Sequence, residues 1–296
     1  MPSLLRDGLT FFLESLPIAF VDFVKLLLPA VTTMRVGHSA TAEDAASYLA
    51  AASIGILAFN VAGQMIASAP LAAMDTIAPQ AHGAGNAPGV GLAGLRAIIT
   101  AIVFLLPTIP LWICAEGILS ALGQPIEVAR LGAVYMRLLL PGLPPLLLFE
   151  LCRKILYAQS IRGPPAYAAA AGLLTHWLWL EVWCRALGEL HGAPLALCCT
   201  YATMAIVQVA HIRWLASQQP ALARTWPRSD QRALLMRDRA AWTLFLTTSG
   251  AALLSLSEWL FWELCAFHVG TVSPSGMHRN AALAKGLSSY GALHHS

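Results

Sequence analysis

The sequence predicts an all-α polytopic membrane protein. Hydrophobic residues make up 57% of the chain and charged residues only 11%, whereas a soluble domain carries about 25% charge. The apolar residues gather in runs longer than about 18 residues, the length that a transmembrane helix needs. These runs lack the strict alternation of a transmembrane β-strand. Because only helices and closed barrels satisfy the backbone in lipid, we expect a helical bundle surrounded by membrane lipid.

Seven membrane spans can be drawn along the chain. They cover roughly residues 16–36, 47–72, 92–115, 128–150, 165–187, 192–214 and 241–267. The first span contains Asp22 and Lys25, whose i, i+3 spacing allows an ion pair on one helix face. A cation site at Asp22 is the alternative. Residues 1–15 precede the first span as a cytoplasmic N-terminus.

The distribution of basic residues predicts the orientation. With the N-terminus inside, the outer edges of the spans hold three basic residues, Arg35, Arg130 and Arg185, and the inner connections hold nine. Those nine are Arg153, Lys154, Arg162, Arg213, Arg224, Arg228, Arg232, Arg237 and Arg239. Such an excess agrees with the positive-inside rule. We therefore expect a multi-pass protein of the plasma membrane or an endomembrane, with a basic connection at 217–240 beside anionic lipid.

Two glutamates, Glu258 and Glu263, are the only charged residues of the span 241–267. A carboxylate at the bilayer centre costs at least a few kcal/mol, so such residues mark ion or proton sites. Their i, i+5 spacing places them about 140° apart around a helix, and each has an indole one turn away, from Trp262 or Trp259. Aromatic faces attract organic cations. The alternative is an interfacial aromatic belt with both acids at the membrane surface.

Other polar residues have simpler interpretations. Asp75 and Gln80 lie near the inner end of the second span, before Gly83 and Gly85; this composition favours a cap or tight turn. His176 lies among tryptophans, where it is either a titrating group or a packed, hydrogen-bonded histidine. We favour the packed histidine.

Several functional classes are not expected. The six cysteines form no CxxC pair, so we predict neither a disulfide framework nor a metal site. The net charge of +3 is small and dispersed, which does not suggest a nucleic-acid partner. The sequence shows no nucleophile motif, metal cluster or phosphate loop, so we expect no enzyme and no cofactor, and it lacks receptor-like motifs. Residues 268–296 have the composition of a disordered tail.

The order of motifs resembles the multidrug and toxic compound extrusion (MATE) transporters of the eukaryotic type. The matching residues are Leu28–Pro29, Val36–His38, Leu49–Ser53, Asn60, Gly63, Ala73–Thr76, Gln80–Gly85, Pro107, Pro110, Trp112, Ile118–Leu119, Gly123–Gln124, Tyr135–Arg137, Pro141–Gly142, Ala158–Gln159, Thr225–Pro227, Glu258–Trp259 and Phe261–Glu263. Each match is weak by itself, but together they follow the order of the family over roughly residues 16–270.

The resemblance implies a fold and an activity. Such transporters have twelve spans in two six-helix lobes around a central cavity, and they export organic cations in exchange for H⁺ or Na⁺. Residues 16–216 would form the N-lobe, 217–240 the linker between lobes, and 241–267 the first helix of the C-lobe. The sequence departs from the family after Gly270, as a truncated gene product would, so we expect a missing C-lobe or a homo-oligomer. We also expect the seventh helix to be poorly anchored.

The resemblance also implies site residues. Glu258 and Glu263 would couple transport to the cation or proton. The candidates for the substrate cavity are Trp259, Trp262, Asn60 and Gln64, and those for gating or turns are Asp75, Gln80, Gly83 and Gly85. The chain departs from the family pattern at Leu95, where a glutamine is usual, and near Thr175–His176, where an asparagine is usual. The alternative function is a non-transporting membrane fragment or a scaffold half-transporter.

Overall fold

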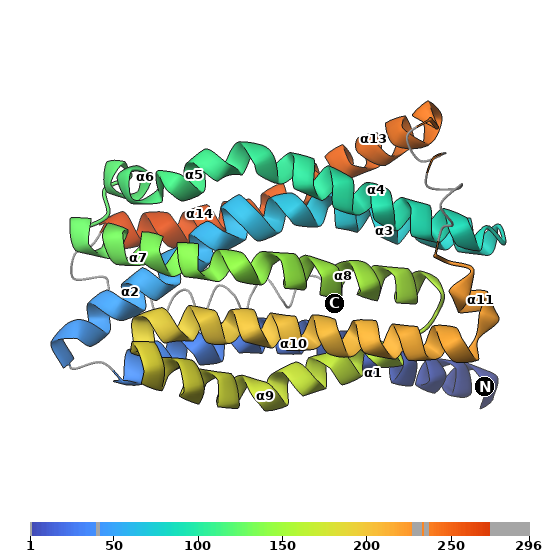
Figure 1. Ribbon diagram of the computed structural model, residues 1–296, viewed down its shortest axis with the longest axis horizontal. Coiled ribbons are helices and arrows are strands. Elements are labelled where there is room, and N and C mark those ends of the chain that lie inside the picture. Colours follow the sequence, from blue (N-terminus) through green and yellow to red (C-terminus); the bar gives the residue numbers. More distant parts are fainter. Residues whose placement is uncertain (1, 40–41, 227–232, 234–236, 273–296) are drawn as a thin grey trace.

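The computed structural model describes residues 2–39, 42–226, 233 and 237–272, and it contains helices and no strand within these ranges. The long helices lie side by side along one axis, with the N-terminus at the same end as the α3–α4, α8–α9 and α10–α11 connections (Figure 1). The expected all-α class is confirmed. In the predicted orientation, this end of the bundle is the cytoplasmic end.

The first part of the chain forms the helices α1 (Pro2–Ser39), α2 (Ala42–Phe59), the π-helix η1 (Asn60–Met65), α3 (Ile66–Gly83), α4 (Ala87–Leu105), the 3₁₀ turn η2 (Leu106–Thr108), α5 (Ile109–Ile113) and α6 (Ala115–Ala121). The second part forms α7 (Ile126–Leu139), the 3₁₀ turn η3 (Leu140–Gly142), α8 (Leu143–Ala158), α9 (Gly163–Leu187), α10 (Glu189–Gln218), α11 (Pro220–Ala223), α13 (Arg239–Ser255) and α14 (Ser257–Val272).

Each of the seven expected spans falls on a long helical segment. Among the residues that the structure describes, five segments are both long and apolar enough to cross a membrane: Ala45–Gly83, Ala87–Ile113, Ile126–Ala158, Glu189–Gln218 and Arg239–Trp262. Helices α1 and α9 also have sufficient length, with 38 and 25 residues. Prolines shape several of these segments, since Pro107 and Pro141 each lie in a 3₁₀ turn that joins two α-helical parts. Proline lacks the N–H that an uninterrupted α-helix requires.

The structure corrects several expected boundaries. Residues 2–15, expected as a cytoplasmic N-terminus, form the first turns of α1. Arg153 and Lys154, expected in a loop, lie inside α8, and Arg213 lies inside α10. Glu150, expected near the end of a span, therefore lies within α8 with two more turns after it. Of the tail expected at 268–296, residues 268–272 belong to α14, and the remainder lies outside the described residues.

Small residues allow close contacts between helices. Helices α9 and α10 pack together extensively, as do α3 with α4 and α2 with α7. A Cβ on Gly55 of α2 would lie 2.9 Å from Tyr135 of α7, and one on Gly172 of α9 would lie 2.4 Å from Met204 of α10. In a membrane, close backbone approach increases the dispersion energy between helices. Glycine is therefore favoured most strongly at Gly55, where the Gly132 carbonyl oxygen also lies 3.0 Å from the added Cβ, whereas at Gly172 the flexible Met204 side chain would have to move.

Helix α13 contacts the bundle through its first half, whereas most of the seventh span remains open, as expected of a poorly anchored helix: only 12% of the span Arg239–Trp262 is buried. It packs against α3 and α4, with Phe245 only 1% exposed and Ser249 fully buried. At its first turn, Arg96 Nη2 of α4 lies 4.0 Å from Asp238 Oδ2, and the Arg96 guanidinium carbon lies 5.8 Å from the centre of the Trp242 ring. These contacts hold the first half of the seventh span.

Candidate functional site

Asn60 and Gln64 both lie in the π-helix η1, where α2 passes into α3. In a π-helical turn the backbone hydrogen bonds join residues i and i+5 instead of i and i+4, and such turns are found frequently at functional sites. Trp112 of α5 supports this segment, because its Nε1 donates a hydrogen bond to the carbonyl oxygen of Ala62 at 3.2 Å. Asn60 and Gln64 are both partly buried. Nothing in the hydrophobic pattern of residues 47–72 indicates this change of helical type.

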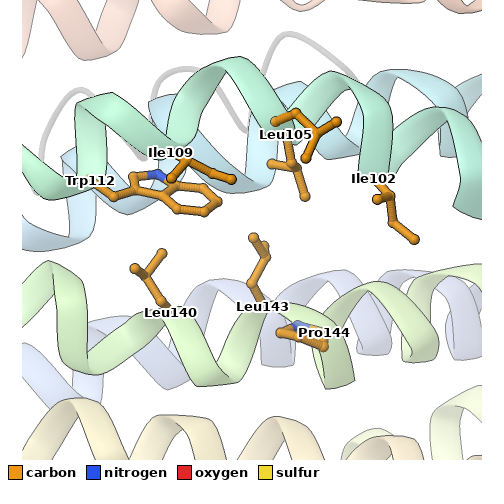
Figure 2. Close-up of a pocket in the computed structure, with 8 residues that line it drawn as sticks. Ile102, Leu105, Ile109, Trp112, Leu140, Leu143 and Pro144 are labelled. Atoms are coloured by element: carbon orange, nitrogen blue, oxygen red, sulfur yellow. The ribbon is translucent and has the colours of Figure 1, made fainter.

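An apolar pocket of about 270 Å³ lies next to η1, between the α4–α5 segment and the η3–α8 segment. Figure 2 shows Ile109 and Trp112 on one side of this pocket, facing Leu140 and Leu143 on the other. The full lining is Ile102, Leu105, Leu106, Ile109, Trp112, Leu140, Leu143 and Pro144. Trp112 links the pocket to η1 through its indole N–H. Such a lining suits the apolar part of a small molecule.

The two acids of the seventh span lie on α14, after a break in the helix at Leu256. Glu258 is exposed and Trp259 is half-buried, while Trp262 is 40% exposed and packs edge-on against Phe261, with ring centres 5.8 Å apart. The side chain of Glu263 lies outside the described residues. At helical rise, Glu258 lies about 28 Å beyond Arg239, compared with a hydrocarbon core of about 30 Å. Glu258 therefore lies near the outer boundary of the hydrocarbon core, where the alternative of an interfacial acid also places it.

Asp75 and the glycines after it have different surroundings. Asp75 lies inside α3 and forms an ion pair with Lys154 of α8, rather than capping a helix. Gln80 is exposed near the end of α3, and its carbonyl accepts a hydrogen bond from the backbone of Ala84.

The connection between α3 and α4 is a tight turn. Gly83 is the last residue of α3, and Gly85 has a φ of 73°, a left-handed conformation that glycine adopts without steric cost. The next residue, Asn86, caps α4 by accepting a hydrogen bond from the Gly89 N–H at 3.0 Å. This turn faces the predicted cytoplasmic side.

Four charged side chains form a network between α1 and α8 that the sequence did not reveal. Lys25 Nζ lies 2.6 Å from Glu150 Oε1, and Arg153 Nη2 lies 2.7 Å from Glu150 Oε2. Arg153 Nη1 also lies 2.9 Å from Asp22 Oδ1. The expected Asp22–Lys25 pair is present at only 3.9 Å, so each of its members has a closer partner on α8.

The network contains two acids and two bases, so its formal charge is zero. Glu150 and Arg153 are buried, and Asp22 remains exposed. The aromatic ring of Tyr157 adds a contact, with the Arg153 guanidinium carbon 5.5 Å from the ring centre. One feature of the sequence could have indicated this network: a second acid–base pair with i, i+3 spacing, Glu150 and Arg153, lies at the end of the fourth span. The network binds the first helix to the fourth span at the cytoplasmic half.

His176 is a packed residue that joins three helices, as favoured from the sequence. Its Nε2 lies 3.1 Å from Thr32 Oγ1 of α1, and its Nδ1 lies 2.8 Å from Thr200 Oγ1 of α10. The side chain is 2% exposed. Since a neutral imidazole donates at one nitrogen and accepts at the other, it can satisfy one threonine in each direction. Within the described residues, no cluster of three or more His, Cys, Asp or Glu side chains could hold a metal ion.

Comparison with known proteins identifies the family. The family model described as MatE matches residues 17–179. The chain belongs to the MatE family. This confirms the resemblance inferred from the motifs, and with the long apolar helices it makes the chain a multi-pass integral membrane protein.

Individual MatE relatives agree with the assignment. The chain is 30% identical over 82% of its length to Protein DETOXIFICATION 37 of Arabidopsis thaliana, covering 46% of that protein. It is 27% identical over 87% of its length to Multidrug and toxin extrusion protein 1 of Danio rerio, covering 42% of that protein. The chain thus spans about half the length of the curated relatives it matches.

A solved structure has the same fold. The crystal structure of the eukaryotic MATE transporter AtDTX14 matches 94% of this chain with a TM-score of 0.75, at 20% sequence identity. The match covers 61% of the AtDTX14 chain. The arrangement of helices described above is therefore that of part of a MATE transporter.

Proposed function

We propose that this MatE chain acts in secondary active transport, exporting organic cations in exchange for H⁺ or Na⁺. The observation that carries the proposal is Glu258, an exposed carboxylate on an apolar helix with Trp259 and Trp262 beside it. An ionisable residue on a membrane-spanning helix marks a candidate functional site. The printed names of the relatives, which refer to detoxification and to multidrug and toxin extrusion, support the direction of transport.

In the proposed exchange, the carboxylate of Glu258 binds the organic cation first and the proton or Na⁺ afterwards. Ionised Glu258 attracts an organic cation, and the indole faces of Trp259 and Trp262 add a cation–π attraction. When a proton or Na⁺ from the outside neutralises the carboxylate, that attraction is lost and the organic cation leaves. Glu263, one turn further along α14, is the second coupling residue in this proposal. The position of Glu258 in the outer half of the span suits release to the outside.

The apolar pocket and η1 have a complementary role in the proposal. The pocket beside Trp112 would hold the apolar part of a substrate, while the amides of Asn60 and Gln64 on η1 would contact its polar groups. Asp75, Gln80, Gly83 and Gly85 would form the connection that moves when the cytoplasmic side opens. Substrates with a flat aromatic body and a single positive charge match this combination best.

Efflux from vesicles tests the proposal. The purified chain is reconstituted in proteoliposomes loaded with a fluorescent quaternary ammonium dye, and efflux is followed under an imposed pH gradient or an imposed Na⁺ gradient. When a C-lobe is supplied by a second, co-reconstituted chain, we expect gradient-driven efflux that Glu258→Gln and Glu263→Gln each reduce sharply without loss of folded protein. From the 296-residue chain alone we expect no efflux. Glu127→Gln, which changes an exposed acid at the start of α7, is the matched control. Wild-type rates from the double glutamine variant would rule out the carboxylate mechanism.

One observation favours a second candidate function. Because the chain spans about half the length of its curated relatives, it could instead be a non-transporting scaffold or half-transporter that acts with another chain. In that case the folded wild-type chain shows no efflux under either gradient, whether or not a C-lobe is supplied. Chemical cross-linking in the membrane then shows whether its partner is a second copy.

A further inference from the structure

A second apolar groove lies between α8 and α10, away from the pocket of Figure 2. It has a volume of about 400 Å³. Its floor is formed by the small residues Ala202 and Ala205 of α10, and its walls by Leu148 of α8 and Ile206 of α10. These walls are open to the surroundings, with Leu148 41% and Ile206 68% exposed. The groove therefore faces the lipid.

One end of the groove is basic. Arg213 lines the groove near the end of α10 and is exposed. It forms no ion pair within the described part of the chain, whereas Lys25, Arg153 and Lys154, which also lie inside long helices, are all paired with acids. The groove thus combines an apolar channel with an uncompensated positive charge at one end. An amphiphile with a negative headgroup has the complementary pattern.

The length of the groove matches one membrane leaflet. Ala202 and Arg213 are eleven residues apart on one helix, which corresponds to about 16 Å along the axis. Half of the hydrocarbon core is about 15 Å. An acyl chain that lies in the groove with its end at Ala202 therefore brings its headgroup to the level of Arg213.

Aromatic residues place this end of α10 at the headgroup level. Trp214 is 59% exposed, and Tyr167 of α9 is 63% exposed and stacks on His211 with ring centres 5.7 Å apart. Exposed tryptophan and tyrosine are enriched at the membrane–water interface. The same end of the bundle carries the N-terminus and the α8–α9 connection (Figure 1), so it is the cytoplasmic end in the predicted orientation. The cytoplasmic leaflet is the one that carries anionic lipid.

From the shape, charge and depth of this groove, we propose that it binds an anionic phospholipid of the cytoplasmic leaflet. One acyl chain lies against Ala202, Ala205 and Ile206, and the phosphate contacts the guanidinium of Arg213. A bound lipid of this kind fills the space between α8 and α10 and neutralises Arg213 at the membrane surface. The site is separate from the carboxylates of α14 and does not depend on transport.

Lipid retention measured by native mass spectrometry tests the site. The purified protein is incubated with phosphatidylglycerol or phosphatidylcholine of the same acyl chains, and bound lipid is counted after release from detergent. Three variants are compared with the wild type: Arg213→Gln removes the headgroup contact, Ala210→Phe fills the groove near its basic end, and Arg130→Gln is the control. Arg130 is an exposed arginine of α7 at the opposite end of the bundle and also lacks an ion pair among the described residues.

We expect the wild type to retain phosphatidylglycerol over phosphatidylcholine. Arg213→Gln should reduce phosphatidylglycerol retention about fivefold, the ratio for one basic residue at a membrane surface. Ala210→Phe should reduce retention of both lipids, and Arg130→Gln should match the wild type. The proposal is overturned if Arg213→Gln retains lipid normally or if Arg130→Gln loses as much. It is also overturned if Ala210→Phe changes only the oligomeric state, because the groove then binds a second copy of the chain.

Discussion

Lys25 Nζ of α1 lies 2.6 Å from Glu150 Oε1 of α8, in a network where Glu150 also accepts two hydrogen bonds from Arg153. Glu150 thus contacts both cations of the network, whereas Lys25 is only one of these two cations. We therefore expect Glu150 to contribute more to the stability of the protein than Lys25.

We expect Glu150→Gln to destabilise the protein more than Lys25→Met. The glutamine leaves two cations beside a single acid, Asp22, and removing one member of a buried pair costs about 3–5 kcal/mol. Lys25→Met leaves Glu150 paired with Arg153, so its cost should be smaller. Thermal unfolding in detergent measures both. Glu116→Gln, in a half-exposed pair 3.9 Å from Arg137, should change stability by less than about 1 kcal/mol. Equal losses for all three variants would contradict the ranking.

His176→Leu should loosen the contact between α1, α9 and α10. The leucine keeps apolar volume but removes the bonds to Thr32 and Thr200. In this variant each threonine hydroxyl can donate to the carbonyl one turn earlier in its own helix, so neither is left without a partner. We expect a loss of about 1–3 kcal/mol in the free energy of unfolding. Trp177→Leu, next to it but 60% exposed, is the control, and a larger loss there would argue against this role of His176.

Gly192→Ala should impair folding because the contact involves backbone atoms. A Cβ at this position would lie 2.4 Å from the Trp183 carbonyl oxygen and 2.6 Å from the Cys184 Cα. Since backbone cannot move away as a flexible side chain does, the cost should reach about 1–3 kcal/mol. Gly117→Ala, with no atom within 4 Å of the new Cβ, should be neutral or slightly stabilising. The yield of monodisperse protein and its melting temperature measure the difference.

Phe245→Ala should release the first half of the seventh span from α3. Phe245 is 1% exposed, whereas its neighbour Leu244 is 57% exposed. Truncating a fully buried phenylalanine costs about 3–5 kcal/mol, so the alanine variant should unfold at lower temperature and be cleaved faster by protease near residue 240. Leu244→Ala should behave like the wild type. Identical behaviour of the two variants would mean that α13 is not held in this way.

Cys114 should react from outside the cell. It is the exposed member of the six cysteines, and it follows the α4–α5 segment, which runs from the cytoplasmic turn at Asn86 to the opposite end of the bundle (Figure 1). In a Cys265→Ser background, which removes the partly exposed cysteine of α14, a membrane-impermeant maleimide should label Cys114 in intact cells that carry the protein in the plasma membrane, and Cys114→Ser should abolish this labelling. Adding Gln218→Cys, at the exposed end of α10, to that variant should restore labelling only after permeabilisation. The reverse pattern would invert the predicted orientation.

The helical spans were predictable because their signal is local. A run of apolar residues long enough to cross the bilayer requires a helix whatever its neighbours are, so the segments around residues 47–72, 92–115 and 192–214 agree with the structure. The packed state of His176 was also favoured correctly, since a histidine among apolar residues usually forms buried hydrogen bonds. The family, too, could be inferred from short motifs in a fixed order.

The contacts between spans could not be predicted in the same way. The i, i+3 spacing of Asp22 and Lys25 suggested that they pair with each other, because the sequence contains only the neighbours along one helix. Their closer partners, Arg153 and Glu150, are more than 120 residues away and reach them only after α1 packs beside α8. The same applies to Asp75, whose partner is Lys154, and to the π-helix at Asn60, where a hydrogen bond from Trp112 reaches the backbone of Ala62.

Hydropathy and length therefore predicted where the long helices lie in the chain, because this depends on the transfer of each segment into lipid, while the orientation in the membrane stays a prediction from the basic residues. The partner of each charged side chain, the change of helical type at η1 and the anchoring of α13 by Phe245 depended on the assembled bundle. A charge inside a membrane is stabilised by whichever opposite charge lies within a few ångströms, and the packing of helices that are distant in sequence sets those distances.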